Sequence, residues 1–187
     1  NYTELWQWSV DNVADFWASL CDYFDVVFSQ RWETVLANKE MPGAKWFIGA
    51  RLNYAENIFA KRTAAKPMLL YKGEDKPYSE HSWADIEEQT RRLAQALRAM
   101  GVEKGDRVVA YLPNIPEAAV AVLAVSSIGA IWSSCPPDFG ESSVLDRFTQ
   151  IEPKVLIAVD GYDYGGKTHD RRAVVAKLQA SLPTVEK

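Results

Sequence analysis

Residues Gly161 to Thr168 match the phosphate-loop pattern Gly-x-x-x-x-Gly-Lys-Ser/Thr letter for letter. In that motif, backbone N–H groups and a lysine hold nucleotide phosphates, and the segment follows a strand and precedes a helix. The intervening residues suit phosphates poorly, because Tyr162 and Tyr164 are bulky and Asp163 would set an anion against anions. Three interpretations stay open: a nucleotide cradle, a surface loop, or a contact of Lys167 with another phosphorylated ligand.

A second segment of chemical interest is the stretch from Ile131 to Gly140, which is apolar at first and then contains adjacent prolines. Pro136 and Pro137 predict a rigid turn after a strand, and Asp138 is a residue type that caps helices. Serine hydroxyls within the strand would line a polar channel on one face only, because side chains alternate between the two faces. The plain alternative is a simple strand-to-helix connection.

Other residue types that carry out chemistry are few and scattered. His81 and His169 are the only histidines, and neither lies near Cys21 or Cys135, so we expect no His/Cys metal site. The two cysteines stand far apart in apolar stretches, which indicates buried thiols in a reducing compartment. No nucleophile–base pair and no paired carboxylates stand out. We therefore predict neither a catalytic residue nor a metal ligand within this chain.

These segments are expected to be held by alternating strands and helices. The predicted strands are Met68–Tyr71, Pro77–Ser82, Val108–Leu112, Ile131–Cys135 and Val155–Val159, with residues 73–76 as the turn between the first two. The predicted helices run from the Ser82 cap to Gly101, from Pro116 to near Gly129, from Ser142 or Ser143 to Pro153, and, after a polar loop over 160–170, to about Leu182.

Strands joined through helices run parallel and have right-handed crossovers. The predicted fold class is therefore α/β, with a partial, mostly parallel sheet, flanking helices and an irregular helical segment before it. Ligands of such sheets bind at the carboxyl ends of the strands. Three segments fall there: residues 112–114, 133–140 and 160–168.

The first sixty residues differ from the rest of the chain. They hold five of the seven tryptophans, namely Trp6, Trp8, Trp17, Trp32 and Trp46. Ser9 is predicted to cap a helix with an apolar face from Val13 to Phe24, residues 41–47 to be irregular, and residues 53–62 to form a short helix. We expect residues 1–60 to be a segment that wraps on a larger body, and residues 61–187 to be the first part of an incomplete domain.

Composition limits the classes of partner. The formal net charge is −4 and the sequence pI is about 5.3, which argues against binding to nucleic acid or to an anionic membrane. The apolar stretch from Ile115 to Cys135 includes Glu117 and Gly129, and we interpret it as a buried helix and a strand rather than a membrane span. Residues 1–10 lack the pattern of a secretion signal. A cytoplasmic location is expected.

Three segments carry a family resemblance. Met41–Asn57 resembles the N-terminal signature of the acetoacetyl-CoA synthetase family. Gly101–Arg107 and Leu112–Glu117 resemble the early strand and helix of the wider acyl-adenylate-forming, or AMP-binding, superfamily. Ile131–Gly140 is again similar to the acetoacetate-activating branch.

The resemblance implies an ATP-dependent acid–CoA ligase that forms acetoacetyl-CoA through an acyl-adenylate, with Mg²⁺, ATP and CoA as cofactor and substrates. The family's ATP loop, hinge and catalytic lysine match nothing in these 187 residues. We therefore expect an N-terminal part that is inactive alone and binds none of these molecules tightly. Its partners would be the remainder of its own chain and a small-molecule acid.

The resemblance also implies a CoA entrance. In acetyl-CoA relatives, two glycines beside the pantetheine path stand where this chain has Pro137 and Asp138. Two arginines near the CoA phosphates stand where it has Tyr164 and Lys167. The resemblance thus implies that Lys167 contacts a CoA phosphate and that Tyr164, Pro137 and Asp138 flank the path.

Three alternative functions remain at this point. The chain could belong to an acetyl- or propionyl-type CoA ligase. It could be a small phosphate-loop NTPase that uses Lys167 and Thr168, in which case Lys167→Ala would abolish nucleotide binding. It could also be a noncatalytic α/β interaction module that docks through its N-terminal aromatic residues.

Overall fold

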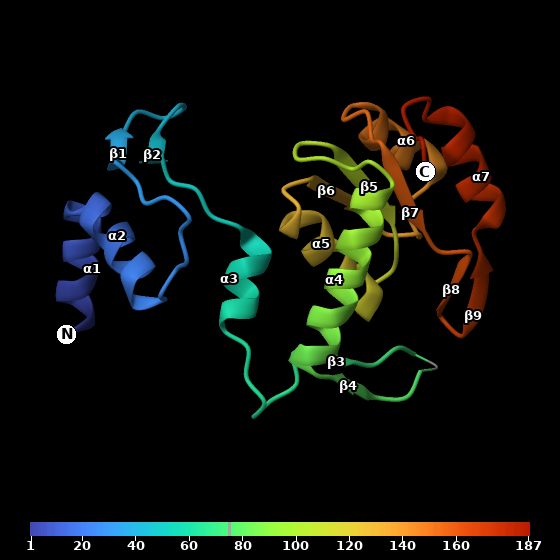
Figure 1. The fold of residues 1–187 in the computed structure, drawn as a ribbon, viewed down its shortest axis with the longest axis horizontal. Helices are drawn as coiled ribbons and strands as arrows, with labels where there is room; N and C mark the ends of the chain where they lie inside the picture. The colour runs from blue at the N-terminus through green and yellow to red at the C-terminus, as the bar shows by residue number, and fades with distance from the viewer. Residues whose placement is uncertain (75) are drawn as a thin grey trace. The chain divides into compact units, whose positions relative to one another are not determined.

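The computed structural model describes residues 1–74 and 76–187, so Asp75 of the predicted 73–76 turn lies outside the described residues. The chain separates into two units, Asn1–Ala60 and Lys61–Lys187 (Figure 1). The first unit contains α1 (Tyr2–Asp11), α2 (Val13–Tyr23), β1 (Thr34–Asn38), β2 (Lys45–Ile48) and α3 (Tyr54–Ala60). The short helix predicted over 53–62 is therefore confirmed as α3.

The predicted cap at Ser9 is wrong, because α1 begins earlier. The Glu4 N–H donates to Asn1 Oδ1 at 3.0 Å, and the Glu4 carboxylate accepts in return, which forms a capping box. Ser9 lies inside α1, and its hydroxyl donates to the Trp6 carbonyl at 2.7 Å. The apolar face that suggested one helix from Val13 onward belongs to α2, which follows a break at Asn12.

The stretch 41–47 is less irregular than predicted. Its last three residues begin β2, which pairs antiparallel with β1 through Leu36 and Trp46. Edge-to-face aromatic contacts support this hairpin, with ring centroids 6.0 Å apart for Trp17 and Trp46 and 5.1 Å apart for Trp32 and Phe47. With four residues, β2 is too short to show a clear alternation of polar and apolar side chains in the sequence, and the nearby Pro42 and Gly43 favour an irregular segment.

The second unit contains the predicted parallel sheet. Its elements are β3 (Leu69–Tyr71), β4 (Ser79–His81), α4 (Trp83–Ala99), β5 (Arg107–Tyr111), α5 (Pro116–Ser127), β6 (Ile131–Cys135), α6 (Glu141–Thr149), β7 (Val155–Ala158), β8 (Gly161–Tyr164), β9 (Lys167–Asp170) and α7 (Arg172–Ser181). The sheet order is β6-β5-β7, and both pairings are parallel. The predicted α/β class, with a partial, mostly parallel sheet and flanking helices, is confirmed.

Local signals set the helix ends. Ser82 Oγ accepts from the Asp85 N–H at 3.1 Å and so caps α4 as predicted. After α4, Gly101 has a φ of +85°, the left-handed conformation that favours glycine at a helix end. Pro116 occupies the first turn of α5, where its missing N–H costs no hydrogen bond.

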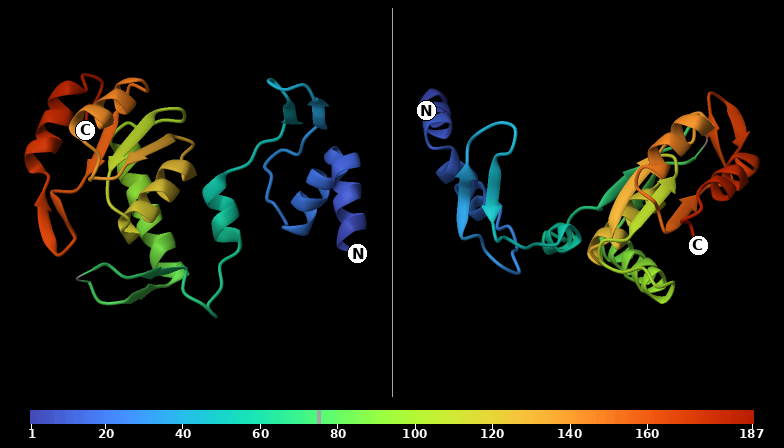
Figure 2. Two further views of the ribbon diagram at one scale, coloured as in Figure 1. Left: turned by 180° about the vertical axis from the view of Figure 1, so that it is seen from behind. Right: turned by 90° about the horizontal axis from the view of Figure 1, so that it is seen from above.

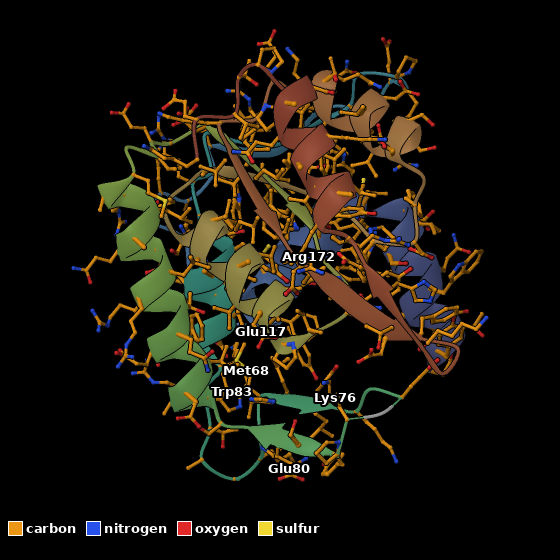
Figure 3. The ribbon with its side chains drawn as sticks, turned by 90° about the vertical axis from the view of Figure 1, so that its right-hand side faces the viewer. Met68, Lys76, Glu80, Trp83, Glu117 and Arg172 are labelled. Carbon is orange, nitrogen blue, oxygen red and sulfur yellow. The ribbon has the colours of Figure 1, made fainter. Side chains whose placement is uncertain are left out.

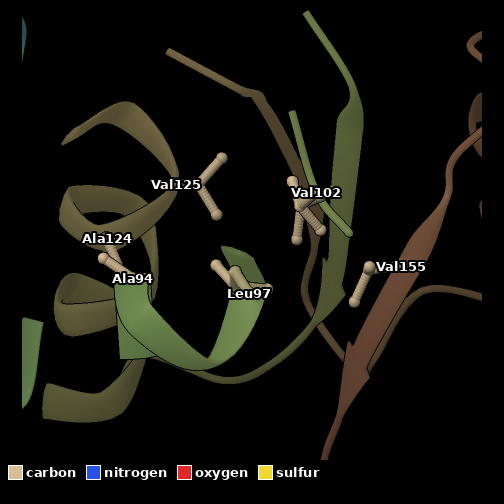
Figure 4. Close-up of a cluster of buried hydrophobic side chains, with 7 residues drawn as sticks. Ala94, Leu97, Val102, Ala124, Val125 and Val155 are labelled. Carbon is tan, nitrogen blue, oxygen red and sulfur yellow. The ribbon is translucent and has the colours of Figure 1, made fainter. Parts of the chain in front are cut away.

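Helices cover both faces of the sheet, and β5 lies in the middle. On one face Val108 packs with Leu97 of α4 and Val125 of α5, and Figure 4 labels Leu97 and Val125 of this cluster. On the other face Val109 packs with Phe148 of α6 and Leu178 of α7. Figure 2 follows the same strands and helices from two further sides. This packing fixes the carboxyl ends of all three parallel strands at one edge.

The predicted polar loop over 160–170 is in part a β-hairpin. β8 and β9 pair antiparallel, with Tyr164 opposite Lys167 and only Gly165 and Gly166 between them. Both glycines have positive φ, +60° and +70°, as a two-residue hairpin turn requires. A Gly-Gly pair between short strands is a known hairpin signal. The same residues also match the phosphate-loop pattern, which predicts a loop instead of a hairpin.

Among the described residues, no helix combines the length and the apolar character needed to span a lipid bilayer.

Candidate functional site

A cavity of about 420 Å³ lies at the carboxyl ends of β5, β6 and β7. The residues that follow these three strands line it: Pro113–Ile115 after β5, Pro136–Asp138 after β6, and Val159 with Gly161–Tyr164 after β7. Tyr71 at the end of β3 also lines it, as do Lys72–Glu74 and Lys76 from the connection between β3 and β4. This edge is where parallel sheets bind ligands.

The lining combines apolar side chains with exposed charged ones. Tyrosine, proline and aliphatic side chains form most of the wall, and the charged residues are Lys72, Glu74, Lys76, Asp138 and Asp163. Such a cavity suits a ligand with a mostly apolar chain and a charged end, because the chain can be desolvated while the charged end stays in water.

Two hairpins meet beside the cavity although about ninety residues separate them in sequence. The Gly166 N–H donates to Glu74 Oε2 at 3.2 Å, and Lys76 Nζ lies 4.0 Å from Asp163 Oδ2. Figure 3 labels Lys76 in the β3–β4 connection. These contacts hold the β8–β9 hairpin against that connection.

The four residues that the sequence singled out have different positions. Pro137, Asp138 and Tyr164 line the cavity. Pro137 is buried, Asp138 is exposed, and Tyr164 is 65% exposed. Lys167 is not one of the described residues that line the cavity; it is exposed opposite Tyr164 at the end of the hairpin. The structure thus brings three of the four together and places Lys167 just beyond them.

The phosphate-loop interpretation of residues 161–168 does not fit this geometry. A phosphate loop curls between a strand and a helix so that successive N–H groups point at the phosphates. Here the same residues form an antiparallel ladder, in which Gly161 pairs with Asp170. The Thr168 hydroxyl, which that motif would direct to a metal, donates to Asp163 Oδ1 at 2.7 Å. We therefore reject the nucleotide cradle.

Sequence reasoning missed the residues that hold the turn after β6. The Pro137 carbonyl accepts two hydrogen bonds, from the Tyr111 hydroxyl at 2.8 Å and from Arg171 Nε at 2.8 Å. Tyr111 carries the only hydroxyl in a buried apolar strand, and a buried tyrosine hydroxyl usually requires a partner. That signal was available in the sequence. No comparable signal distinguishes Arg171 from Arg172.

Burial governs the protonation of two groups in this region. Desolvation raises the pKa of Tyr111 above its ordinary value, so the hydroxyl keeps its proton and remains a donor. Desolvation also raises the pKa of the buried Cys135 thiol, which makes it a poor nucleophile. Cys21 is half-buried rather than buried, and burial raises its pKa as well.

Within the described part of the chain, no group of three or more histidine, cysteine, aspartate or glutamate side chains is placed to hold a metal ion.

Comparisons with known proteins cover the whole chain. The model of the family described as AMP-binding enzyme matches residues 57–187, and the model described as acetyl-coenzyme A synthetase N-terminus matches residues 2–58. The acetoacetyl-coenzyme A synthetase of Rhizobium meliloti (strain 1021) is 43% identical over 187 residues, which are 99% of this chain and 29% of that protein. The acetoacetyl-CoA synthetase of Gallus gallus is 42% identical over 190 residues.

A solved structure is also similar. The acetoacetyl-CoA synthetase from Streptomyces lividans superposes with a TM-score of 0.95 and 51% sequence identity. The match covers 100% of this chain and 29% of that one, so the chain spans less than a third of the length of these relatives.

Proposed function

Because the chain belongs to the AMP-binding enzyme family, we propose that it is the N-terminal part of an ATP-dependent acid–CoA ligase that forms acetoacetyl-CoA from acetoacetate. The observation that carries this proposal is the match of the whole chain, in sequence and in fold, to acetoacetyl-CoA synthetases. The relatives described for this chain are named acetoacetyl-CoA synthetases, which favours acetoacetate over the acetate or propionate of the alternative ligases.

The proposed reaction has two steps. A carboxylate oxygen of acetoacetate bonds to the α-phosphorus of ATP, and pyrophosphate leaves, which gives an acyl-adenylate. The CoA sulfur then bonds to the acyl carbon, AMP leaves, and the thiol proton passes to solvent. Mg²⁺ supplies charge neutralisation at the phosphates when it is bound.

We assign the cavity at the strand ends to the entrance for CoA. Its proline and tyrosine walls would pack along the pantetheine arm, and the turn at Pro137 and Asp138 would limit its width. Lys167 stands exposed beyond the cavity, next to Tyr164, where the nucleotide end of CoA would remain in water. Its ammonium group would donate to a CoA phosphate there, as a point charge suited to phosphate.

We propose that residues 1–60 wrap on the remainder of the full-length protein, which would be the main partner of this chain. A small-molecule acid is the proposed substrate, and the cytoplasm is the proposed location. Residues 61–187 would supply the first part of the domain that binds AMP, while the groups that act on ATP would come from the remainder of the protein.

The test compares the full-length protein with the chain 1–187. With acetoacetate, ATP, Mg²⁺ and CoA, the full-length protein should release AMP and form a thioester, and the chain alone should form neither acyl-adenylate nor thioester. Acetate and propionate serve as competing acids. A preference for either of them would contradict the acetoacetate assignment, and adenylate formation by the chain alone would contradict its role as a noncatalytic part.

A further inference from the structure

Arg171 joins two walls of the cavity without being part of its lining. Its Nε donates to the Pro137 carbonyl at 2.8 Å, and its Nη2 donates to the Tyr162 hydroxyl at 3.1 Å. Its backbone N–H donates to the Asp160 carbonyl at 2.7 Å. Pro137 and Tyr162 both line the cavity, so one half-buried side chain links the turn after β6 to β8.

The contacts depend on the shape of a guanidinium group. Its carbon lies 5.1 Å from the centroid of the Tyr162 ring, so the same group stacks on the ring while its fork donates in two directions. A lysine ammonium has no planar fork and cannot reproduce this combination. The Tyr162 ring also stacks on the His169 ring, with the ring centroids 5.0 Å apart and an angle of 21° between the ring planes.

The Pro137 carbonyl would keep one donor if Arg171 were changed. Tyr111, which is 1% exposed, donates to the same oxygen, and a carbonyl has two lone pairs. The turn would therefore remain attached to β5 but lose its link to β8. The expected consequence is a change in the spacing of two cavity walls, with the fold retained.

We propose that Arg171 is a positioning residue that sets the width of the cavity and thereby the affinity for CoA. This inference rests on the proposed function, because it takes the cavity to be the CoA entrance. Arg171 acts through Pro137 and Tyr162 and does not touch the reacting atoms.

The test uses the full-length protein with Arg171→Met, Arg171→Lys and Tyr162→Phe. We expect Arg171→Met to raise KM for CoA about tenfold, which corresponds to about 1.4 kcal/mol. Arg171→Lys should raise it similarly, and Tyr162→Phe less, because the ring remains. The KM for ATP and the rate of acetoacetate-dependent ATP–pyrophosphate exchange should not change, since adenylate formation precedes CoA binding.

Arg172→Met is the matched control, because Arg172 is the adjacent arginine and pairs with Asp170 at the surface. The KM of Arg172→Met for CoA should equal that of the full-length protein without a substitution. The inference would be overturned if Arg172→Met raised the KM for CoA as much as Arg171→Met does. It would also be overturned if Arg171→Met left the KM for CoA unchanged, or if Arg171→Met lost ATP–pyrophosphate exchange in parallel. Should Arg171→Met fail to fold, Arg171→Lys decides by the same criteria.

Calorimetric titration with CoA separates this inference from the proposed function. If the unmodified full-length protein binds CoA but makes no thioester, the proposed reaction is contradicted, while weaker binding by Arg171→Lys still supports the positioning role. If the unmodified protein does not bind CoA, the inference itself is overturned.

Discussion

Asp106 and Lys154 hold the edge of the parallel sheet that lies opposite the cavity. Their ion pair spans 2.9 Å, both side chains are about a quarter exposed, and each precedes a strand. Asp106 also accepts from the Glu103 N–H at 2.9 Å, and Lys154 Nζ donates to the Gly101 carbonyl at 2.7 Å. One pair of side chains thus ties the loop after α4 to the starts of β5 and β7.

The pair predicts a dependence of stability on pH. The Glu103 N–H and then Lys154 lower the pKa of Asp106 below its ordinary value of 3.8. A lowered folded pKa contributes stability above the unfolded pKa and loses it as pH falls through the folded pKa. Asp106→Asn should therefore reduce the free energy of unfolding by about 1 kcal/mol at neutral pH.

Urea unfolding of the chain at neutral pH and below pH 3.8 checks this expectation. The difference between unmodified protein and Asp106→Asn should shrink in acid. Exposed Asp146 on α6 provides the control substitution, Asp146→Asn, for which we expect little change at either pH. A difference that stays constant across this range would refute the assignment.

At the scale of elements, the β8–β9 hairpin is held by its turn and by the contacts of Gly166 and Asp163 with the β3–β4 connection. Gly165 and Gly166 have no atoms within 4 Å of where a Cβ would stand, so a side chain there would meet no clash. The cost of substitution would come only from positive φ, which is high for β-branched residues and low for asparagine. The hairpin carries Tyr164 and Lys167, so its order matters for the proposed CoA contact.

We predict that Gly166→Val weakens the hairpin by about 1–2 kcal/mol, while Gly166→Asn is nearly neutral. Hydrogen exchange of the β8 and β9 amides should show faster exchange in the valine variant only. Gly140→Ala is a suitable control, since Gly140 has a φ of −62° and also has no atom near its missing Cβ. Equal protection in the valine and asparagine variants would show that positive φ does not control this turn.

At the scale of the whole molecule, the chain divides between Ala60 and Lys61, and residues 61–66 are all exposed. Boundaries between independently packed units commonly fall in such segments. The family models divide nearly at the same place, with one ending at residue 58 and the other starting at residue 57.

Limited trypsin digestion should therefore cut the chain first at Lys61 or Arg62, because Pro67 follows Lys66 and blocks cleavage there. The expected early products are one piece near residues 1–62 and one that extends to residue 187, both identified by mass spectrometry. Lys177 within α7 is the internal reference for a helical site, and cleavage there should be later. Early cleavage at Lys177 at a comparable rate would contradict the boundary.

Local signals explain how much of the fold was predictable. The Ser82 cap, Gly101 after α4, Pro116 at the start of α5 and the apolar run of β5 each act within a few residues, and all were interpreted correctly. Two predictions were wrong because two local signals competed. Ser9 was interpreted as a helix cap, whereas Asn1 and Glu4 cap the helix that contains Ser9. Residues 160–170 were interpreted as a loop with a phosphate-loop match, whereas Gly165 and Gly166 form the turn of a hairpin.

By itself, the sequence determined the α/β order, the parallel sheet and the family, because periodicity, caps and motif letters are short-range properties of a chain. Only the tertiary structure decided which side chains hold the cavity. The Pro137 carbonyl takes its two donors from residues 26 and 34 positions away. Such bonds depend on where packed helices and strands bring distant backbone atoms, and no spacing along the chain records that position.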